Sequence, residues 1–208
     1  MIGLEKDGGL WRVTLNRPQK ANSLTRAMLA RIEEIALEAE AARAAALVLT
    51  GTGKVFSAGA DLEEAHDGLA TDGVWERVSG TLARLPALTV AALNGTLAGG
   101  AFGMVLACDL RLAVPGARFF YPAIKLGFLP QPSDPARLAA LVGPARAKLL
   151  LMGNTRLSAE EALAFGLIDR IVVPEALEAT VADLAAPALA ADPQVRARIK
   201  AMCEGRSF

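Results

Sequence analysis

The chain has 208 residues, of which 53% are hydrophobic and 21% charged, as is typical of a globular domain and not of a disordered chain. Lys plus Arg and Asp plus Glu each total 22, so the charge gives no reason to expect nucleic acid or an anionic membrane as a partner. The single His excludes metal sites built from several histidines, and no metal is expected. Two cysteines without a C-x-x-C motif, no signal peptide and no long apolar run favour a cytoplasmic protein.

Short strand patterns alternate with amphipathic helices along the chain. Strands are expected over residues 10–15, 46–50, 88–93, 110–114 and 167–173, and helices from 25, over 71–85, over 99–107, and from 143, 158, 174 and 192. Thr25 is a candidate N-cap, and Ser158 with Glu161 forms a capping box. This alternation predicts an α/β domain with parallel strand pairing over residues 1–173, followed by a helical segment over 174–208.

Two glycine-rich turns follow two of the predicted buried strands. They cover residues 56–62 and 94–102. Glycine lets a ligand approach backbone N–H groups, and a helix that begins at such a turn adds partial positive charge. Two of these turns could direct two N–H donors at one carbonyl oxygen, which is the requirement of an oxyanion hole. The alternative is that both turns are structural, and Asp61 with Glu64 is also a plain capping box.

Further short motifs accompany these turns in a fixed order. They are residues 16–18 (Asn-Arg-Pro), 49–51 (Leu-Thr-Gly), 94–95 (Asn-Gly), 99–100 (Gly-Gly), 108–111 (Cys-Asp-Leu-Arg), 126–127 (Leu-Gly) and 166–169 (Gly-Leu-Ile-Asp). As a series they resemble the crotonase (enoyl-CoA hydratase/isomerase) superfamily over roughly residues 2–175. The resemblance implies a spiral of β-β-α units, here with a shortened C-terminal helical region, assembled as a homotrimer or hexamer.

The same resemblance implies an acyl-CoA thioester as the substrate, with coenzyme A as part of it and no separate cofactor. By motif position, the N–H groups of Ala60 and Gly100 would bind the thioester oxygen and stabilise an enolate. The coenzyme A part would lie against Lys20, Ala21, Ala58, Asp61 and Leu62. For Lys20, a solvated surface lysine is the alternative reading.

Both glutamates that hydratases of this superfamily use are missing here. The first would lie three residues after Gly100, where the chain has Gly103, and the second would follow Pro122, where the chain has Ala123. Water addition then lacks an obvious general acid or base. We therefore expect an acyl-CoA enzyme that is not an efficient hydratase, such as a decarboxylase or a thioester hydrolase; the alternative is a catalytically silent acyl-CoA-binding protein. Restoring both glutamates is expected to raise hydration.

Other polar side chains are candidates for the missing chemistry. Gln131 could orient a substrate or be a plain turn residue, and His66 could act as a base or be a solvated surface residue. Tyr121 is expected either to line the acyl pocket or to pack in the core. Ser133 and Asp134 are expected to cap the helix that follows them.

Overall fold

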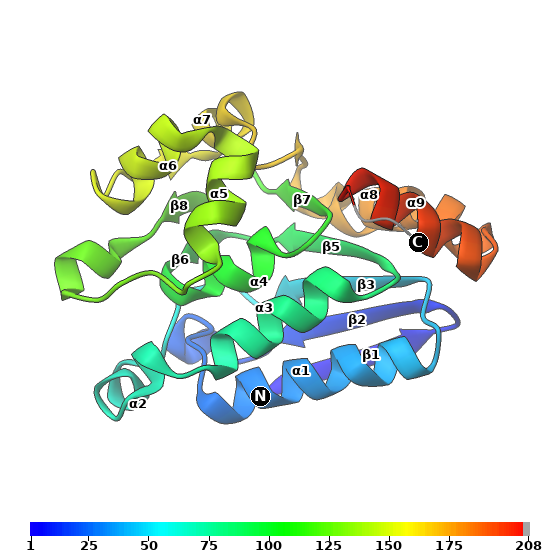
Figure 1. Ribbon diagram of the computed structural model, residues 1–208, viewed down its shortest axis with the longest axis horizontal. Coiled ribbons are helices and arrows are strands. Elements are labelled where there is room, and N and C mark those ends of the chain that lie inside the picture. The colour runs from blue at the N-terminus through cyan, green and yellow to red at the C-terminus, as the bar shows by residue number, and fades with distance from the viewer. Residues whose placement is uncertain (206–208) are drawn as a thin grey trace.

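The computed structural model describes residues 1–205, which form two β-sheets with helices around them (Figure 1). The larger sheet has the order β1 (Ile2–Asp7), β2 (Leu10–Leu15), β3 (Ala46–Gly51), β5 (Leu88–Leu93), β7 (Leu110–Ala113) and β10 (Arg170–Ile171). From β2 onward its neighbours pair in parallel, as predicted, whereas β1 pairs with β2 in an antiparallel hairpin that the sequence analysis did not anticipate.

A smaller sheet lies beside the larger one, and the candidate pocket described below lies at one of its edges. Its order is β4 (Val55–Ser57), β6 (Thr96–Ala98), β8 (Arg118–Phe120) and β9 (Leu157–Ser158). The first three strands are parallel and β9 is antiparallel to β8. The chain gives one strand to each sheet in turn, β3 then β4, β5 then β6, and β7 then β8, before each helical stretch. This order confirms the expected spiral of β-β-α units.

Helices cover both faces of the larger sheet. Residues 46–49 of β3 are all buried, which requires cover on both sides of the strand. On one side α1 (Arg26–Ala41) and α3 (Val74–Arg84) lie side by side (Figure 1). On the other, α8 (Pro174–Ala190) lies over β3 and β5, with Leu177 and Val181 near Val48 and an ion pair from Glu178 to Arg12.

The C-terminal segment is joined to this core. The last helix, α9 (Pro193–Cys203), places the Lys200 ammonium 2.9 Å from an oxygen of Asp109 and 3.0 Å from the Ala87 carbonyl oxygen. Residues 206–208 of the predicted segment lie outside the described residues. Among residues 1–205, none of the helices is both long and apolar enough to cross a lipid bilayer.

Shorter helices complete the molecule. They are α2 (Leu62–His66), α4 (Phe102–Leu106), α5 (Asp134–Val142), α6 (Pro144–Leu151) and α7 (Ala159–Phe165), with 3-10 turns η1 (Pro18–Lys20), η2 (Leu69–Thr71), η3 (Gly99–Ala101) and η4 (Pro122–Leu126). Two predicted caps are confirmed: Thr25 Oγ1 accepts from the Met28 N–H, and Ser158 and Glu161 form a reciprocal capping box.

Two predicted elements are shorter than expected. The helix predicted over 99–107 consists of the 3-10 turn η3 followed by α4. The strand predicted over 167–173 is only β10, because the N–H groups of Leu167 and Ile168 donate to the Ala162 carbonyl and so end α7 instead of joining the sheet.

Candidate active site

A pocket opens where the three parallel strands of the smaller sheet end. Its walls include Ala58 and Ala60, which follow β4, then Gly99 and Gly100, which follow β6, and Tyr121, which follows β8. Its cavity volume is about 110 Å³. The carboxyl ends of parallel strands meet at one edge of a sheet, so segments far apart in the sequence converge here.

The two glycine-rich turns contact each other through their backbones. Gly59 has φ +94°, and a Cβ atom there would lie 2.9 Å from the Ala98 carbonyl oxygen and 3.4 Å from the Gly100 nitrogen. Gly99 has φ +58°, and a Cβ atom there would lie 3.5 Å from the Gly59 Cα. A side chain at position 59 would therefore separate the turns, and the positive φ of Gly99 is one that side chains rarely adopt. Glycine allows Ala60 and Gly100 to share one wall of the pocket.

Hydrogen bonds fix the direction of the Ala60 N–H group. Leu24 pairs with Ala60 in a parallel bridge, in which the Leu24 N–H donates to the Gly59 carbonyl at 2.8 Å and the Asp61 N–H donates to the Leu24 carbonyl at 2.9 Å. The Gly59 carbonyl and the Ala60 N–H belong to one planar trans peptide, so they point in opposite directions. The Ala60 N–H therefore points away from Leu24.

Gly100 offers the second N–H group from the start of η3. The first N–H groups of a helical turn have no acceptor within that turn. A Cβ atom on Gly100 would lie 3.2 Å from the Trp75 ring, which forms part of the pocket wall. The Trp75 ring is held in place because its Nε1–H donates to the Leu69 carbonyl at 2.7 Å. Only glycine therefore fits at position 100 without displacing the indole.

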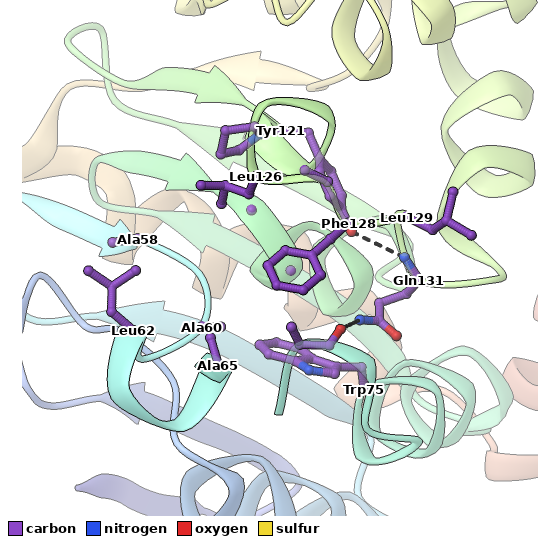
Figure 2. Close-up of a pocket in the computed structure, with 15 residues that line it drawn as sticks. Ala58, Ala60, Leu62, Ala65, Trp75, Tyr121, Leu126, Phe128, Leu129 and Gln131 are labelled. Atoms are coloured by element: carbon purple, nitrogen blue, oxygen red, sulfur yellow. Dashed lines mark hydrogen bonds between the residues drawn. The ribbon is translucent and has the colours of Figure 1, made fainter. Parts of the chain in front are cut away.

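The structure places the proposed coenzyme A residues in different settings. Lys20 is exposed, and the Ala21 carbonyl accepts from the Ala58 N–H at 3.0 Å, which joins two of the predicted contact segments. Leu62 is 72% exposed beside the pocket and contributes to its lining. Figure 2 shows Leu62 and Ala58 on the same side of the pocket.

The Asp61 side chain makes hydrogen bonds within the protein fold around its own turn. One carboxylate oxygen caps α2 through the N–H groups of residues 63 and 64, and the other accepts from Arg17 and Ser23. The Arg17 hydrogen bond lowers the pKa of Asp61. The reciprocal half of the predicted capping box is not formed, because Glu64 accepts from the Arg26 N–H while the Asp61 N–H donates to Leu24. The Asp61 side chain therefore holds the turn that carries Ala60.

The catalytic candidates divide between the pocket and the surface. Gln131 lines the pocket, where its side-chain amide donates to the Ala70 carbonyl at 3.0 Å and its backbone N–H donates to the Tyr121 hydroxyl at 3.3 Å (Figure 2). Ala123 lines the pocket, whereas Gly103, the position of the other missing glutamate, is not among the lining residues. His66 is the exposed last residue of α2 and is not among the residues that line the pocket.

Gly103 faces a carboxylate. It lies in α4 and is buried, and a Cβ atom on it would be 2.9 Å from Oδ1 of Asp134. Asp134 has no exposed surface, and its Oδ2 accepts from the Tyr121 hydroxyl at 2.8 Å. Within residues 1–205, Asp134 Oδ1 has no hydrogen-bond partner. A buried carboxylate thus lies where a side chain at position 103 would begin.

The expectation that Ser133 and Asp134 cap α5 is wrong. Ser133 is the residue before the helix, but it makes no capping hydrogen bond with its side chain. Its N–H and hydroxyl both donate to Glu76 of α3, and the Asp134 side chain contacts Tyr121. Instead of capping α5, Ser133 connects it to α3, and Asp134 connects it to Tyr121 at the start of η4.

The surroundings change the protonation of the Tyr121 and Asp134 pair. Burial is the main reason that the pKa of Asp134 is raised to about 7; the charge of Glu76 acts in the same direction, whereas the Tyr121 hydrogen bond and Arg137 oppose the rise. Burial and the nearby Asp134 carboxylate also raise the pKa of Tyr121. Near neutral pH, Asp134 therefore exists in both protonation states while Tyr121 stays neutral.

Sequence reasoning missed several residues of the pocket. They are Ala65, Ala70, Trp75, Gly99, Pro122, Leu126, Phe128 and Leu129. Leu126 and Leu129 are 60% and 88% exposed, so this apolar segment forms an open rim. The signal was present in the run Leu-Gly-Phe-Leu-Pro at 126–130, which is too apolar for an ordinary surface turn. Figure 2 shows Leu62 and Ala65 on one side of the pocket and Leu129 and Gln131 on the other.

Known proteins are similar to this chain in both sequence and fold. Residues 5–206 match the profile of the enoyl-CoA hydratase/isomerase family. The short-chain-enoyl-CoA hydratase of Clostridium acetobutylicum is 35% identical over 189 residues, 88% of this chain and 72% of that protein. 4-Chlorobenzoyl coenzyme A dehalogenase-2 of an Arthrobacter species is 32% identical over 209 residues, 96% of this chain and 76% of that protein.

Solved structures agree with the sequence matches. The crystal structure of an enoyl-CoA hydratase subunit from Geobacillus kaustophilus superposes with a TM-score of 0.89 at 32% identity, covering 98% of this chain and 81% of that one. The spiral of two sheets, the paired glycine turns and these matches lead to one assignment. The chain belongs to the enoyl-CoA hydratase/isomerase family, within the crotonase superfamily.

Proposed function

We propose that the protein is an enzyme acting on acyl-CoA thioesters, and that the N–H groups of Ala60 and Gly100 form its oxyanion hole. The observation that carries this proposal is that Ala60 and Gly100, from two turns that touch each other, both line one apolar pocket. Donors fixed in this way stabilise negative charge that develops on a thioester oxygen, because they need not reorient during the reaction. The substrates that the names of both relatives indicate are coenzyme A thioesters, which supports the same ligand class.

Decarboxylation of a malonyl-type thioester fits this pocket best. The bond between Cα and the carboxylate breaks, CO₂ leaves, and the electron pair remains as an enolate, so no base is needed. None of the residues found to line the pocket within 1–205 is charged. A substrate carboxylate therefore loses solvation on binding, whereas neutral CO₂ does not, and the apolar walls favour its loss.

Two rival functions use the same binding site. Thioester hydrolysis would use the oxyanion hole to stabilise a tetrahedral intermediate after attack by water. A silent acyl-CoA binder would use it only to hold the carbonyl oxygen. Hydration is disfavoured because Gly103 and Ala123 carry no acid or base.

The pocket also limits the acyl group. A cavity of about 150 Å³ is known to hold a benzene molecule. The cavity here is about 110 Å³, so we expect malonyl and methylmalonyl groups to bind better than benzoyl groups. The aromatic substrate that the dehalogenase's name indicates would need a wider pocket.

Calorimetry and mass spectrometry together test the proposal. Titration with acetyl-, malonyl-, methylmalonyl- and benzoyl-CoA measures affinity, and mass spectrometry of an incubated mixture identifies products. Conversion of malonyl- to acetyl-CoA supports the decarboxylase, and release of free coenzyme A supports the hydrolase. Binding with an unchanged mixture supports the silent binder. Absence of binding across the whole panel would overturn the proposal.

A further inference from the structure

We propose that Tyr121 and Asp134 form the proton-transfer pair of this pocket, with the carboxylate of Asp134 filling the space left by the missing side chain at Gly103. The inference rests on the proposed function, since it requires an acyl-CoA thioester in the pocket. Tyr121 is the group that meets the substrate, and Asp134 acts through it as a positioning and proton-holding residue.

The first support is the shape of the corner between α4 and α5. Gly103 lies one helical turn after Gly100, so the two residues lie on the same side of this helical segment. The missing Cβ of Gly103 leaves room for Asp134 Oδ1, at 2.9 Å from the Cβ position. The Asp134 carboxylate on α5 thus lies beside the position on α4 where the superfamily resemblance expects a glutamate.

The second support is the connection from that carboxylate to the pocket. Tyr121 lines the pocket, and its hydroxyl donates to Asp134 and accepts from the Gln131 N–H (Figure 2). A hydroxyl oxygen has two lone pairs, so one remains after the bond from Gln131. The tilted contact of the Tyr121 ring with Phe102, at 5.4 Å between centroids, helps to hold the ring.

The third support is that Asp134 is poised to change its charge. Glu76 of α3 and Arg137 of α5 are the other charged groups that act on it, and they oppose each other. Burial is the largest influence and holds the pKa near 7. A purely structural carboxylate is usually supplied with enough donors to keep it ionised, whereas Asp134 Oδ1 has no partner among residues 1–205.

The step balances without any further reactant. When Asp134 is neutral, its carboxyl proton donates to the free lone pair of the Tyr121 oxygen, which leaves the hydroxyl proton of Tyr121 available to the pocket. After CO₂ leaves, the enolate Cα takes that hydroxyl proton, so a C–H bond forms as the O–H bond breaks. The neutral Asp134 carboxyl passes its proton to the phenolate oxygen, which restores Tyr121 and leaves Asp134 as a carboxylate. Solvent then returns one proton to Asp134. The reverse path removes a Cα proton from a saturated thioester and exchanges it with solvent.

Hydrogen exchange at Cα of a saturated thioester tests proton transfer by Tyr121 and Asp134 without requiring decarboxylation. Propionyl-CoA is incubated in D₂O with the full-length protein, deuterium incorporation is followed by mass spectrometry, and affinity is measured separately by calorimetry. We expect Tyr121→Phe to lower the exchange rate about 10²–10⁴-fold, the usual contribution of a proton-transfer group, with little change in affinity. Asp134→Asn should lower the rate and remove the inflection near neutral pH.

Controls separate chemistry from folding. Thr180→Ala removes one side-chain hydrogen bond on α8, away from the pair, and its exchange rate should match the wild type. Near-ultraviolet circular dichroism checks that each variant keeps its packing. Wild-type exchange by Tyr121→Phe, an unchanged pH profile in Asp134→Asn, or binding without exchange by the wild type would each overturn this inference alone. Absence of propionyl-CoA binding would overturn the proposed function and this inference with it.

Discussion

Oδ1 of Asp134 lies 2.9 Å from the point where a Cβ atom on Gly103 would be, although the two residues belong to different helices. Real Cβ atoms do not show so short a distance, so a side chain at position 103 requires the Asp134 carboxylate to leave its present position. The absence of a glutamate at 103 is therefore coupled to the presence of an aspartate on α5.

The first prediction concerns hydration of crotonyl-CoA, measured as loss of the conjugated thioester absorbance. We expect the wild type to work near the background rate. The double variant Gly103→Glu with Ala123→Glu should also fail, which revises the expectation from sequence, because its new glutamate collides with Asp134. Adding Asp134→Gly removes the collision, and we expect this triple variant to gain hydration. Ordinary hydratase turnover by the wild type would contradict the account.

The second prediction concerns stability against pH. The pKa of Asp134 rises from its ordinary value to about 7 on folding, so the folded state binds more protons than the unfolded state between about pH 4 and pH 7. The contribution of this group to the free energy of unfolding is greatest below that window and falls as pH rises through it, by up to roughly 4 kcal/mol. Asp134→Asn should remove this fall. Urea unfolding across this pH range measures it, and parallel curves for both proteins would contradict it.

The third prediction concerns the wall beside the oxyanion hole. Gly100→Ala places a Cβ atom 3.2 Å from the Trp75 ring, whose position the Leu69 hydrogen bond fixes. We expect a loss of about 1–3 kcal/mol in stability, as for other overpacked sites, and weaker acyl-CoA binding. Gly116→Ala is the matched control, because nothing lies within 4 Å of its Cβ position. Thermal unfolding and calorimetry compare the two, and equal behaviour would argue against the proposed wall.

The fourth prediction concerns Lys20. If its exposed ammonium contacts the 3′-phosphate of coenzyme A, Lys20→Ala should weaken binding of acetyl-CoA by about 0.2–1 kcal/mol, as for an exposed ion pair. Binding of acetyl-dephospho-CoA, which lacks that phosphate, should not change. Lys148→Ala on α6 is the matched control for loss of an exposed lysine. If Lys20→Ala weakened binding of both ligands equally, Lys20 would not act through the 3′-phosphate.

The fifth prediction concerns assembly as a homotrimer or hexamer. Ile124, Leu129 and Met152 are 49%, 88% and 66% exposed and line one apolar hollow of about 370 Å³, which association would cover. Sedimentation velocity at micromolar concentration should give a trimer or a multiple of it. Met152→Lys should weaken association because it places a charge in that hollow. A wild-type monomer would contradict the expectation.

The sequence predicted the four central strands of the larger sheet well, but it missed β1 and the short strands of the smaller sheet. The strands at 46–50 and 88–93 are apolar runs bounded by turn residues, which is a strong local signal. The strands β4, β6 and β8 have three residues each, too few for any periodicity to appear. The two glycine-rich turns were still recognised, because their glycines are visible without knowing the strands, and the superfamily resemblance then supplied Ala60 and Gly100 as the oxyanion-hole candidates.

The Asp134 carboxylate could not be placed from the sequence. Ser133 and Asp134 stand before an apolar helical pattern, where a cap is the ordinary interpretation. The contacts of Asp134 with Tyr121 and Gly103 depend on how α4, α5 and η4 pack against one another. Local sequence patterns do not reveal this packing. Tyr121 was expected in the pocket or the core, and the structure satisfies both readings, since the residue is buried and lines the pocket.

The bridge between Leu24 and Ala60 also determines when the proposed oxyanion donor, the Ala60 N–H, acquires its direction. The peptide that carries the Ala60 N–H is held from behind by a fully buried residue more than thirty positions earlier. Rotating that peptide would break a hydrogen bond inside the core, so the direction of this proposed oxyanion donor is set during folding and not during each turnover. Under the proposed function, the segment that follows η1 lies outside the pocket but limits how far the site must reorganise when charge develops.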